Sequence, residues 1–274
     1  MYDKIRNDEL QDIINKLPGS LFSRHVYCFF SIESTNVYAK ELAKSGAAEG
    51  SLVIAERQTR GQGRMGRPWH SPSCSNLLFS IIFRPPFSID RAFSLTMIAA
   101  LAVVDAINKI TGLSALIKWP NDVFFNNKKV AGILTEFSAK RKNIEYVVVG
   151  IGLNVNWDIS NEPELKHVAT SLINETGRPV SRLDLLATIF EFLEEYYELL
   201  LKGQEELVYK RWNDFSMVIG KEALINSTGK RIKAKVKRID RNGALVIEDE
   251  TGKESSVVCG DLEVLFPSLT PAQR

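Results

Sequence analysis

An arginine-rich segment jointed by glycines is the strongest chemical signal in the chain. Residues 57–69 read Arg-Gln-Thr-Arg-Gly-Gln-Gly-Arg-Met-Gly-Arg-Pro-Trp, with four arginines and no acid. Glycines let a backbone approach a ligand closely and guanidinium groups neutralise anions, so the segment predicts an anion-binding loop that closes over its ligand. The alternative is a surface loop whose glycines only form turns. Trp69 is either a core residue or a platform for a nucleotide base.

The glycines of this loop also have the G-x-G-x-x-G spacing of a dinucleotide-binding fingerprint. That fingerprint requires a helix directly after the glycines, because the helix N-terminus holds the pyrophosphate. Pro68, Pro72 and several serines follow instead, which excludes a Rossmann domain. The sequence also contains no Walker-type phosphate loop.

A second chemical motif, Lys118-Trp119-Pro120-Asn121-Asp122, follows a predicted strand. Proline prevents a continuing helix, so the lysine, the amide and the carboxylate lie on a rigid corner. Such a corner could meet a phosphate or a magnesium ion, although an ordinary turn would explain Pro-Asn-Asp alone.

Two later segments, 129–136 and 149–156, combine strand-like sequence with unusual residues. Lys129 opens the first, and a lysine buried without an anion would be unfavourable. Gly132, Gly150 and Gly152 interrupt the strands. Glycine weakens a strand unless something must approach its backbone, so these positions predict the floor of a ligand slot.

The elements that position these residues follow from periodicity and turn signals. Apolar, β-branched runs predict the strands of one sheet at 51–55, 76–83, 115–119, 130–137 and 145–155. Helices are predicted at 37–45, 92–110 and 181–203, the last with Ser181 and Asp184 at capping-box spacing. After Trp212, short strand-like pieces alternate with turns, which indicates a small all-β module.

The β module contains a basic stripe, which we define as residues 230–241. Seven lysines and arginines stand there against one acid, Asp240. A solvated strand face is the usual explanation of such a run. The alternative is a surface for an acidic protein partner or a bound nucleotide.

Composition limits the class of protein. The chain has 274 residues, and 35 Lys and Arg minus 33 Asp and Glu leave a net charge of +2. This balance is that of an ordinary soluble protein of one large or two unequal domains, and it disfavours a globally basic nucleic-acid binder. Three scattered cysteines and three scattered histidines predict neither a disulfide framework nor a metal centre, and they fit a reducing compartment.

The chain shows no targeting signal. Residues 1–12 are polar and lack the apolar stretch of a secretory signal. The longest apolar run, Leu95–Val104, is shorter than the roughly 18 residues of a membrane span. We therefore expect a cytoplasmic protein that is not inserted in a membrane.

Taken in order over residues 30–156, the motifs resemble those of the biotin protein ligases and, more distantly, the lipoate ligases. The resemblance implies an α+β fold, with a mixed central sheet flanked by helices. This class II synthetase-like catalytic domain would comprise residues 1–215, and a small SH3-like β-barrel would comprise residues 216–274. The implied activity is that of an ATP-dependent biotin-[acetyl-CoA-carboxylase] ligase, which forms biotinyl-5'-AMP and transfers biotin to a lysine of a carrier protein.

The resemblance also assigns roles to individual residues. A biotin site is implied for Ser34, Thr35, Asn36, Gln58, Gly61, Gln62, Gly63, Arg64, Lys129, Gly132 and Gly150. An ATP site is implied for Arg64, Arg67, Trp69, Lys118, Asn121, Lys129 and Asn154. Catalysis is implied for Arg64, Lys129 and Asp122, where Asp122 is either the base for the acceptor lysine or a group that orients magnesium or water. In one departure, Gln62 replaces the first arginine of the commonest family loop.

The implied ligands are biotin, ATP and Mg2+, and the implied partner is a biotin carboxyl carrier protein or a carrier domain of a carboxylase. About 20 to 25 residues precede the catalytic domain. Because these are too few for a helix-turn-helix unit, we expect a monofunctional enzyme that does not bind DNA. A monomer and a homodimer both stay open.

Two other functions compete with biotin ligation. A lipoate-protein ligase is the nearest, but the polar residues 34–36 and Gln58 suit a ureido ring better than an alkyl chain. A non-catalytic nucleotide- or RNA-binding protein that uses the basic stripe is the alternative from another class.

Overall fold

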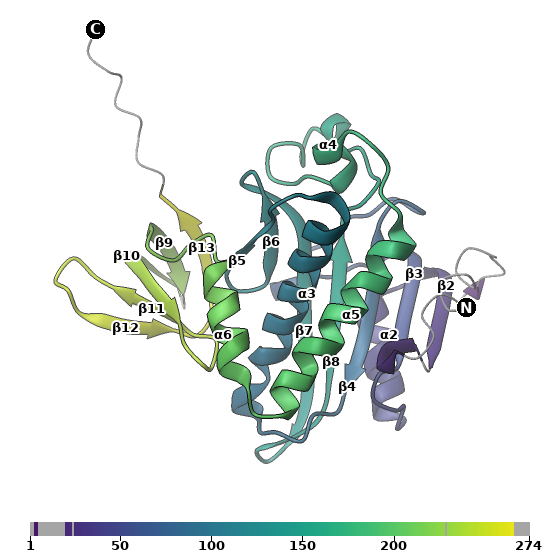
Figure 1. The fold of residues 1–274 in the computed structure, drawn as a ribbon, viewed down its shortest axis with the longest axis horizontal. Coiled ribbons are helices and arrows are strands. Elements are labelled where there is room, and N and C mark those ends of the chain that lie inside the picture. The colour runs from purple at the N-terminus through teal and green to yellow at the C-terminus, as the bar shows by residue number, and fades with distance from the viewer. Residues whose placement is uncertain (1–2, 5–19, 24, 228, 266–274) are drawn as a thin grey trace, which may run out of the picture.

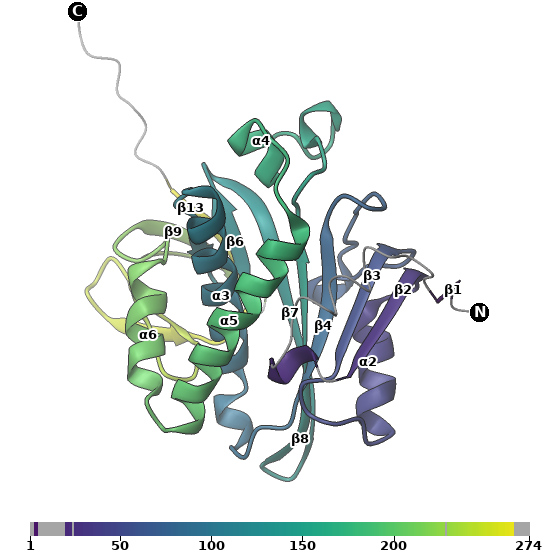
Figure 2. The ribbon, with the colours of Figure 1, turned by 45° about the vertical axis from the view of Figure 1, so that its right-hand side comes forward.

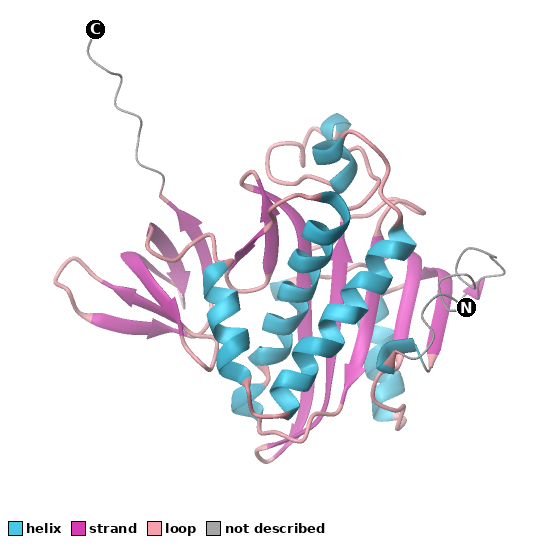
Figure 3. Ribbon diagram, in the orientation of Figure 1, coloured by secondary structure: helices cyan, strands magenta, loops and turns pink. Residues whose placement is uncertain are grey.

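The computed structural model describes residues 3–4, 20–23, 25–227 and 229–265. Most of the N-terminal segment 1–12, on which the expectation of no secretory signal rests, lies outside these residues. The described chain forms an eight-stranded sheet covered by helices and a separate five-stranded sheet (Figures 1 and 3). A mixed central sheet with a small β module is thus confirmed.

The large sheet has the strand order β1-β2-β3-β4-β8-β7-β6-β5. Strands β2 and β3 are parallel, and the other neighbours are antiparallel. All five predicted strands are present, whereas β1, β2 and β6 were not predicted. The strands are β1 (Asp3–Lys4), β2 (Val26–Ile32), β3 (Leu52–Gln58), β4 (Leu77–Phe83), β5 (Leu116–Lys118), β6 (Asp122–Phe125), β7 (Lys128–Lys140) and β8 (Asn143–Leu153).

Helices cover both faces of this sheet. Helices α3 and α5 lie across the front face and α2 lies behind it (Figures 1 and 2). The predicted N-terminal cap at Ser181 is confirmed, because its hydroxyl accepts a hydrogen bond from the Asp184 backbone N–H at 3.2 Å. Gly112, at φ 76°, ends α3. Helix α6 was not predicted. The helices are α2 (Thr35–Lys44), α3 (Phe93–Thr111), α4 (Leu172–Thr176), α5 (Arg182–Leu201) and α6 (Glu205–Asp214).

Alternation along the strands divides the core between the two faces. In β3, Leu52 and Ile54 belong to the cluster under α3 and α5, whereas Val53 and Ala55 belong to the cluster under α2. Successive strand residues point to opposite faces, so each strand contributes to both clusters. The residues of β7 and β8 that face α2 are therefore the ones that can line a cleft on that side of the sheet.

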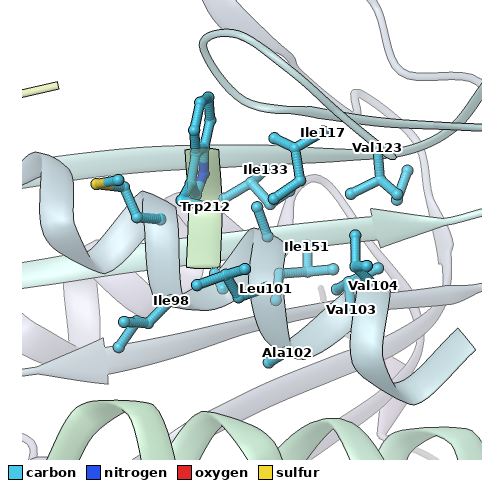
Figure 4. Close-up of a cluster of buried hydrophobic side chains, with 14 of the residues drawn as sticks. Ile98, Leu101, Ala102, Val103, Val104, Ile117, Val123, Ile133, Ile151 and Trp212 are labelled. Carbon is cyan, nitrogen blue, oxygen red and sulfur yellow. The ribbon is translucent and has the colours of Figure 1, made fainter. Parts of the chain in front are cut away.

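Helix α3 is apolar because it is the central core helix. The helical segment Ile89–Thr111 is long and apolar enough to cross a membrane, with a mean hydropathy of 1.6 over its most apolar 18 residues. However, 78% of this stretch is buried inside the protein. Figure 4 shows its side chains against the sheet and against Trp212 of α6. The apolar composition of Leu95–Val104 is therefore explained by burial in the protein core. The shortness of this run, on which the expectation was based, is not the deciding observation.

The small sheet has the order β12-β11-β10-β9-β13 and is entirely antiparallel. The predicted turns are confirmed by the positive φ of Gly229, Gly243 and Gly252. Gly243 also joins the two sheets, since a Cβ there would lie 1.9 Å from the Phe93 ring and its carbonyl accepts the Trp119 indole N–H at 2.9 Å. Its strands are β9 (Glu222–Ser227), β10 (Lys230–Ile239), β11 (Leu245–Glu248), β12 (Glu254–Val257) and β13 (Asp261–Val264).

The basic stripe coincides with β10 and the turn after it. Acids from neighbouring segments pair with four of its seven cations, and these pairs are Lys233–Glu250, Lys237–Glu248, Arg238–Glu254 and Arg241–Glu206. Pairing with acids of neighbouring strands, a turn and helix α6 supports the interpretation of the stripe as a solvated strand face.

The cysteines should differ in reactivity. None of the three forms a disulfide, and burial together with the charge of Glu56 raises the pKa of Cys28 from 9.0 to about 11. The thiolate is the reactive form, and a rise of this size lowers the thiolate fraction of Cys28 at pH 8 about a hundredfold, so Cys28 should react more slowly than an ordinary thiol. Titration with a disulfide reagent at pH 8 should show two fast thiols, Cys74 and Cys259, and one slow thiol. A Cys28→Ser variant should lose only the slow phase, and three equal rates would contradict the structure.

Candidate active site

A cleft of about 320 Å3 opens on the α2 face of the large sheet, within the volume range of small-molecule sites. The N-terminus of α2, the arginine-rich loop and the corner between β5 and β6 surround it. All but two of the residues to which the sequence analysis assigns a site role line this cleft. The two exceptions are Gly61 and Asn154.

Two rows of the sheet form the floor. In the first, Gly150 of β8 pairs with Ser80 of β4 on one side and with Leu134 of β7 on the other. The side chain of Asn36 lies directly on Gly150, where a Cβ would be 1.9 Å from the Asn36 Oδ1 atom. Gly150 therefore makes room for Asn36.

The second row places Gly152 beside Gly132 and Gly132 beside Asp122. The Trp69 indole lies on this row. A Cβ at Gly152 would lie 2.6 Å from the Trp69 ring, and a Cβ at Gly132 would lie 3.1 Å from it. The predicted glycine floor is thus present, but the groups that approach it most closely are the protein's own Asn36 and Trp69. Trp69 is half-buried rather than a core residue, and its indole N–H has no hydrogen-bond partner among the described residues.

One end of the cleft is polar and nearly neutral. The Gln58 Oε1 atom accepts the backbone N–H of Thr35 at 2.7 Å, which joins the end of β3 to the start of α2. Ser34 occupies the N-cap of α2 in extended conformation, yet its hydroxyl makes no capping bond. The first turn of α2 consequently presents its polar groups to the cleft.

The other end is cationic. Lys129 Nζ lies 2.7 Å from Asp122 Oδ1, as an ion pair rather than an aligned hydrogen bond, and 5.3 Å from the centre of the Trp69 ring. Lys118 Nζ lies 4.9 Å from the centre of the Phe124 ring. Asp122 thus pairs with the lysine that faces the cleft.

The arginine-rich loop folds as a narrow hairpin over this end. The Gly63 amide donates to Arg67 O at 2.7 Å, and the Trp69 amide donates to Gly61 O at 2.9 Å. A Cβ at Gly61 would lie 2.6 Å from the Trp69 carbonyl oxygen. Gly61 is therefore required inside the hairpin and is not among the residues that line the cleft, and its place in the biotin site stays a prediction.

Arg64 reaches from the hairpin to the corner between β5 and β6 and to the small sheet. Its guanidinium donates to Asn121 Oδ1 at 3.3 Å and to the backbone oxygen of Gly260 at 3.4 Å. These distances are at the long limit of hydrogen bonds, so the contacts are weak and a stronger anionic acceptor could replace them.

Asn154 was placed in the ATP site, but it lies beneath the cleft. Its side chain is 4% exposed, and its amide N–H donates to Thr170 O at 3.0 Å while its backbone N–H donates to Val130 O. These bonds hold segment 168–170 beside the Lys129 strand. Asn154 is not among the residues that line the cleft, and its bonds support the strand that carries Lys129. Its contact with ATP stays a prediction.

The sequence analysis missed the contribution of the small sheet. Asp261 and Leu262 of β13 line the cleft, and Asp261 forms an ion pair with Arg67. This bond raises the pKa of the Arg67 guanidinium above its ordinary value. No local signal marked Asp261, because an isolated acid in a β module becomes a site residue only when the two sheets dock.

The part of the chain that the structure describes holds no cluster of three or more His, Cys, Asp or Glu that could bind a metal. The carboxylates of the cleft are Asp122 and Asp261, and each is paired with a cation. These residues do not by themselves fit a magnesium site, so such an ion would depend on oxygen atoms of a bound ligand.

Comparison with known proteins identifies the family. The model of the biotin/lipoate A/B protein ligase family matches residues 28–154. The bifunctional ligase/repressor BirA of Bacillus spizizenii is 34% identical over 249 residues, which cover 90% of this chain and 76% of that protein. The biotin-[acetyl-CoA-carboxylase] ligase of Paracoccus denitrificans is 38% identical over 169 residues, or 58% of this chain and 68% of that protein.

The fold agrees with this relationship. The structure of the biotin protein ligase from Aquifex aeolicus in complex with biotin and ATP matches with a TM-score of 0.76 and 27% identity, covering 88% of this chain and 99% of that one. The chain belongs to the biotin/lipoate A/B protein ligase family.

Proposed function

We infer that this chain is an ATP-dependent biotin protein ligase of the AMP-forming type. In the first half-reaction the biotin carboxylate attacks the α-phosphorus of ATP and forms biotinyl-5'-AMP and pyrophosphate. In the second, an acceptor lysine attacks the mixed anhydride, forms an amide bond to biotin and releases AMP. The two substrates are those named for the related Aquifex aeolicus structure.

One observation carries this conclusion. A single cleft joins a polar, nearly neutral end at residues 34–36 and Gln58 to a cationic end at Arg64, Arg67, Lys118 and Lys129. Biotin has the matching polarity, with a neutral ureido ring at one end and a carboxylate at the other. ATP would bring its phosphates to the same cationic end, so the reacting groups would meet there.

The residues at the cationic end stabilise charge instead of forming a covalent intermediate. The Lys129 ammonium and the Arg64 guanidinium would bind the carboxylate and the α-phosphate as negative charge gathers around the phosphorus. Lys129 would exchange Asp122 for the phosphate when ATP binds. The hairpin and Trp69 would cover the mixed anhydride and exclude water, which would otherwise hydrolyse it.

Magnesium would neutralise part of the triphosphate charge when it binds with ATP. Because Asp122 and Asp261 are both paired with cations, the phosphate oxygens of the nucleotide would hold the ion. Asp122 is at the mouth of the same end, and it is our candidate for the base that deprotonates the acceptor lysine once Lys129 has moved to the phosphate.

The acceptor that we propose is a biotin carboxyl carrier protein or domain, in agreement with the name of the Paracoccus denitrificans relative. The polar groups at residues 34–36 favour biotin over lipoate as the activated acid. Lack of DNA binding, cytoplasmic location and the choice between monomer and homodimer stay predictions.

Transfer of radiolabelled biotin tests the function directly. With Mg-ATP and a carboxyl carrier domain, the label should become acid-stable on the carrier, and a carrier whose acceptor lysine is replaced should stay unlabelled. Exchange of labelled pyrophosphate into ATP should depend on biotin and not on lipoate. Exchange with lipoate alone, or no exchange with either acid, would overturn the assignment.

Lys129→Ala should block the first half-reaction. Removal of a preorganised charged donor typically lowers a rate on the order of 10²- to 10³-fold, and here it also leaves Asp122 without its cation. Single-turnover formation of biotinyl-5'-AMP is the measurement. Lys128→Ala, on the preceding strand residue, is the matched control and should keep the wild-type rate. An unchanged rate in Lys129→Ala would remove Lys129 from the mechanism.

Arg64→Ala should release the adenylate early. A hydrogen bond to a charged group contributes roughly 1.5–3 kcal/mol, so we expect dissociation to accelerate about 10- to 100-fold. Partition of labelled adenylate between solution and carrier in a chase experiment measures this. Arg60→Ala is the control, because Arg60 forms an exposed pair with Glu33. Equal retention by both variants would show that Arg64 does not hold the intermediate.

A further inference from the structure

The two acceptors of Arg64 belong to different sheets. Its Nη1 atom lies 3.3 Å from Asn121 Oδ1, in the corner between β5 and β6. Its Nη1 and Nη2 atoms also lie 3.5 and 3.4 Å from the backbone oxygen of Gly260, in the turn before β13. These contacts leave two of the five guanidinium N–H groups for an anion. The direction of the guanidinium therefore depends on the separation between the corner and the small sheet.

On the large-sheet side, the acceptor is fixed to β7. The Asn121 backbone oxygen accepts the Ile133 N–H at 2.9 Å, and the Asn121 side-chain N–H donates to Ile133 O at 2.6 Å. Because a backbone oxygen can only accept, the amide nitrogen must face Ile133, and Oδ1 must face Arg64. Asn121 thus presents its acceptor from a defined place in the large sheet.

Trp119 connects this corner to the small sheet. Its indole N–H donates to the backbone oxygen of Gly243 at 2.9 Å, and the side chain is 2% exposed. Water does not replace a partner at such a buried position, so a shift of the small sheet would leave both the donor and the acceptor unsatisfied. The bond therefore resists any change in the separation between the corner and the small sheet.

The turn that accepts this bond is itself rigid. The Asp240 carboxylate accepts the backbone N–H groups of Asn242 and Ala244, both at 2.9 Å, and the Gly243 N–H donates to Asp240 O at 3.0 Å. Gly243 has a φ of 80° and lies on the Phe93 ring at the start of α3, where a Cβ would be 1.9 Å from the ring. The accepting carbonyl is thus held in one place against the large domain.

The apolar core between the two sheets does not by itself set their relative position. The small sheet shares a hydrophobic core with α3 and α6, and such contacts resist separation but have no preferred direction. The directional contacts are hydrogen bonds at two places. Asn213 Oδ1 of α6 accepts the Ile239 N–H of β10 at 3.1 Å, and Trp119 bonds to Gly243 at the corner. The second of these lies in the same corner as the Asn121 acceptor of Arg64.

We propose that Trp119 is a positioning residue for Arg64. Its bond to Gly243 holds the small sheet at the separation at which one guanidinium can bond to Asn121 and Gly260 together. The two remaining N–H groups of Arg64 are thereby aimed before the ligand arrives. The indole N–H is committed to Gly243, so Trp119 acts through Arg64 and not through a hydrogen bond of its own to the ligand. The proposal rests on the proposed function, in which Arg64 retains biotinyl-5'-AMP.

Removal of the indole donor without a change of shape tests this role. Benzothienylalanine, a tryptophan isostere in which sulfur replaces the N–H, should be incorporated at position 119. We expect biotinyl-5'-AMP to dissociate about threefold to tenfold faster, the effect of one buried hydrogen bond, in the chase experiment with labelled adenylate. The same replacement at Trp212 is the matched control. Trp212 is fully buried, and its indole N–H has no hydrogen-bond partner among the described residues, so the wild-type rate should persist.

A double-mutant cycle with Arg64→Ala distinguishes positioning from a general structural defect. In Arg64→Ala protein, the isostere at position 119 should change the dissociation rate less than about twofold, because the guanidinium that Trp119 positions is absent. Effects that multiply would show that the indole acts by another route and would overturn the proposal. An unchanged rate in the single variant, or an equal effect at Trp212, would overturn it as well. Trp119→Phe removes the same donor and provides a second form of the cycle.

The outcomes also separate this proposal from the assigned function. Wild-type protein that forms no biotinyl-5'-AMP from biotin and ATP would refute the function itself. Wild-type formation together with multiplying effects would refute only the positioning role of Trp119. Full retention of the adenylate by Arg64→Ala would remove Arg64 and Trp119 from the mechanism and leave the ligase assignment in place.

Discussion

The cleft depends on two positions in β8 that carry no side chain. At Gly150 and Gly152, a methyl group would lie 1.9 Å from Asn36 and 2.6 Å from Trp69, far inside van der Waals contact. Because the two side chains rest on the backbone, the polar end of the cleft and the end that holds Trp69 lie in adjacent rows of one sheet. Packed sheet interiors are stiff, so this arrangement places the two binding regions at a fixed separation.

The small sheet completes the cleft in addition to packing beside it. Its contacts come from turns and an edge strand: Gly243 receives the Trp119 indole N–H, Gly260 receives Arg64, and Asp261 pairs with Arg67. The exposed Arg67–Asp261 pair contributes at most about 1 kcal/mol, whereas the buried Trp119 bond joins two rigid turns. The buried bond and the hydrophobic core that the small sheet shares with α6 and α3 hold the small sheet in place, whereas the hairpin is held to it by weaker, more exposed bonds.

Two of the four cations at the cationic end of the cleft are paired with acids. Lys129 is held by Asp122 and Arg67 by Asp261, so neither cation waits unpaired for the phosphates. The side chains of the first pair are 30% and 24% exposed, so water lowers the free energy needed to exchange a carboxylate for a phosphate oxygen. In the reaction that we propose, Asp122 would lose Lys129 to the phosphate and would then face the acceptor lysine.

The sequence by itself determined the local chemistry. It placed glycines within β7 and β8, a rigid Trp-Pro-Asn-Asp corner, a glycine-jointed cationic loop and a capped helix at Ser181, because each of these features depends on neighbours in the chain. The missed elements show the limit of that reasoning: β2 and α6 carry no distinctive turn or cap signal, and β6 begins inside a motif that also fits a plain turn.

Only the tertiary structure decided which distant residues meet. Cross-strand register placed Ser80, Gly150 and Leu134 in one row under Asn36, and docking of the small sheet brought Asp261 to Arg67. The same packing places Asn154 beneath the floor of the cleft, and it requires a glycine at position 61 inside the hairpin. Periodicity assigns a residue to a face, but its partner across that face is set by strand order and register, which depend on the packing of the whole core.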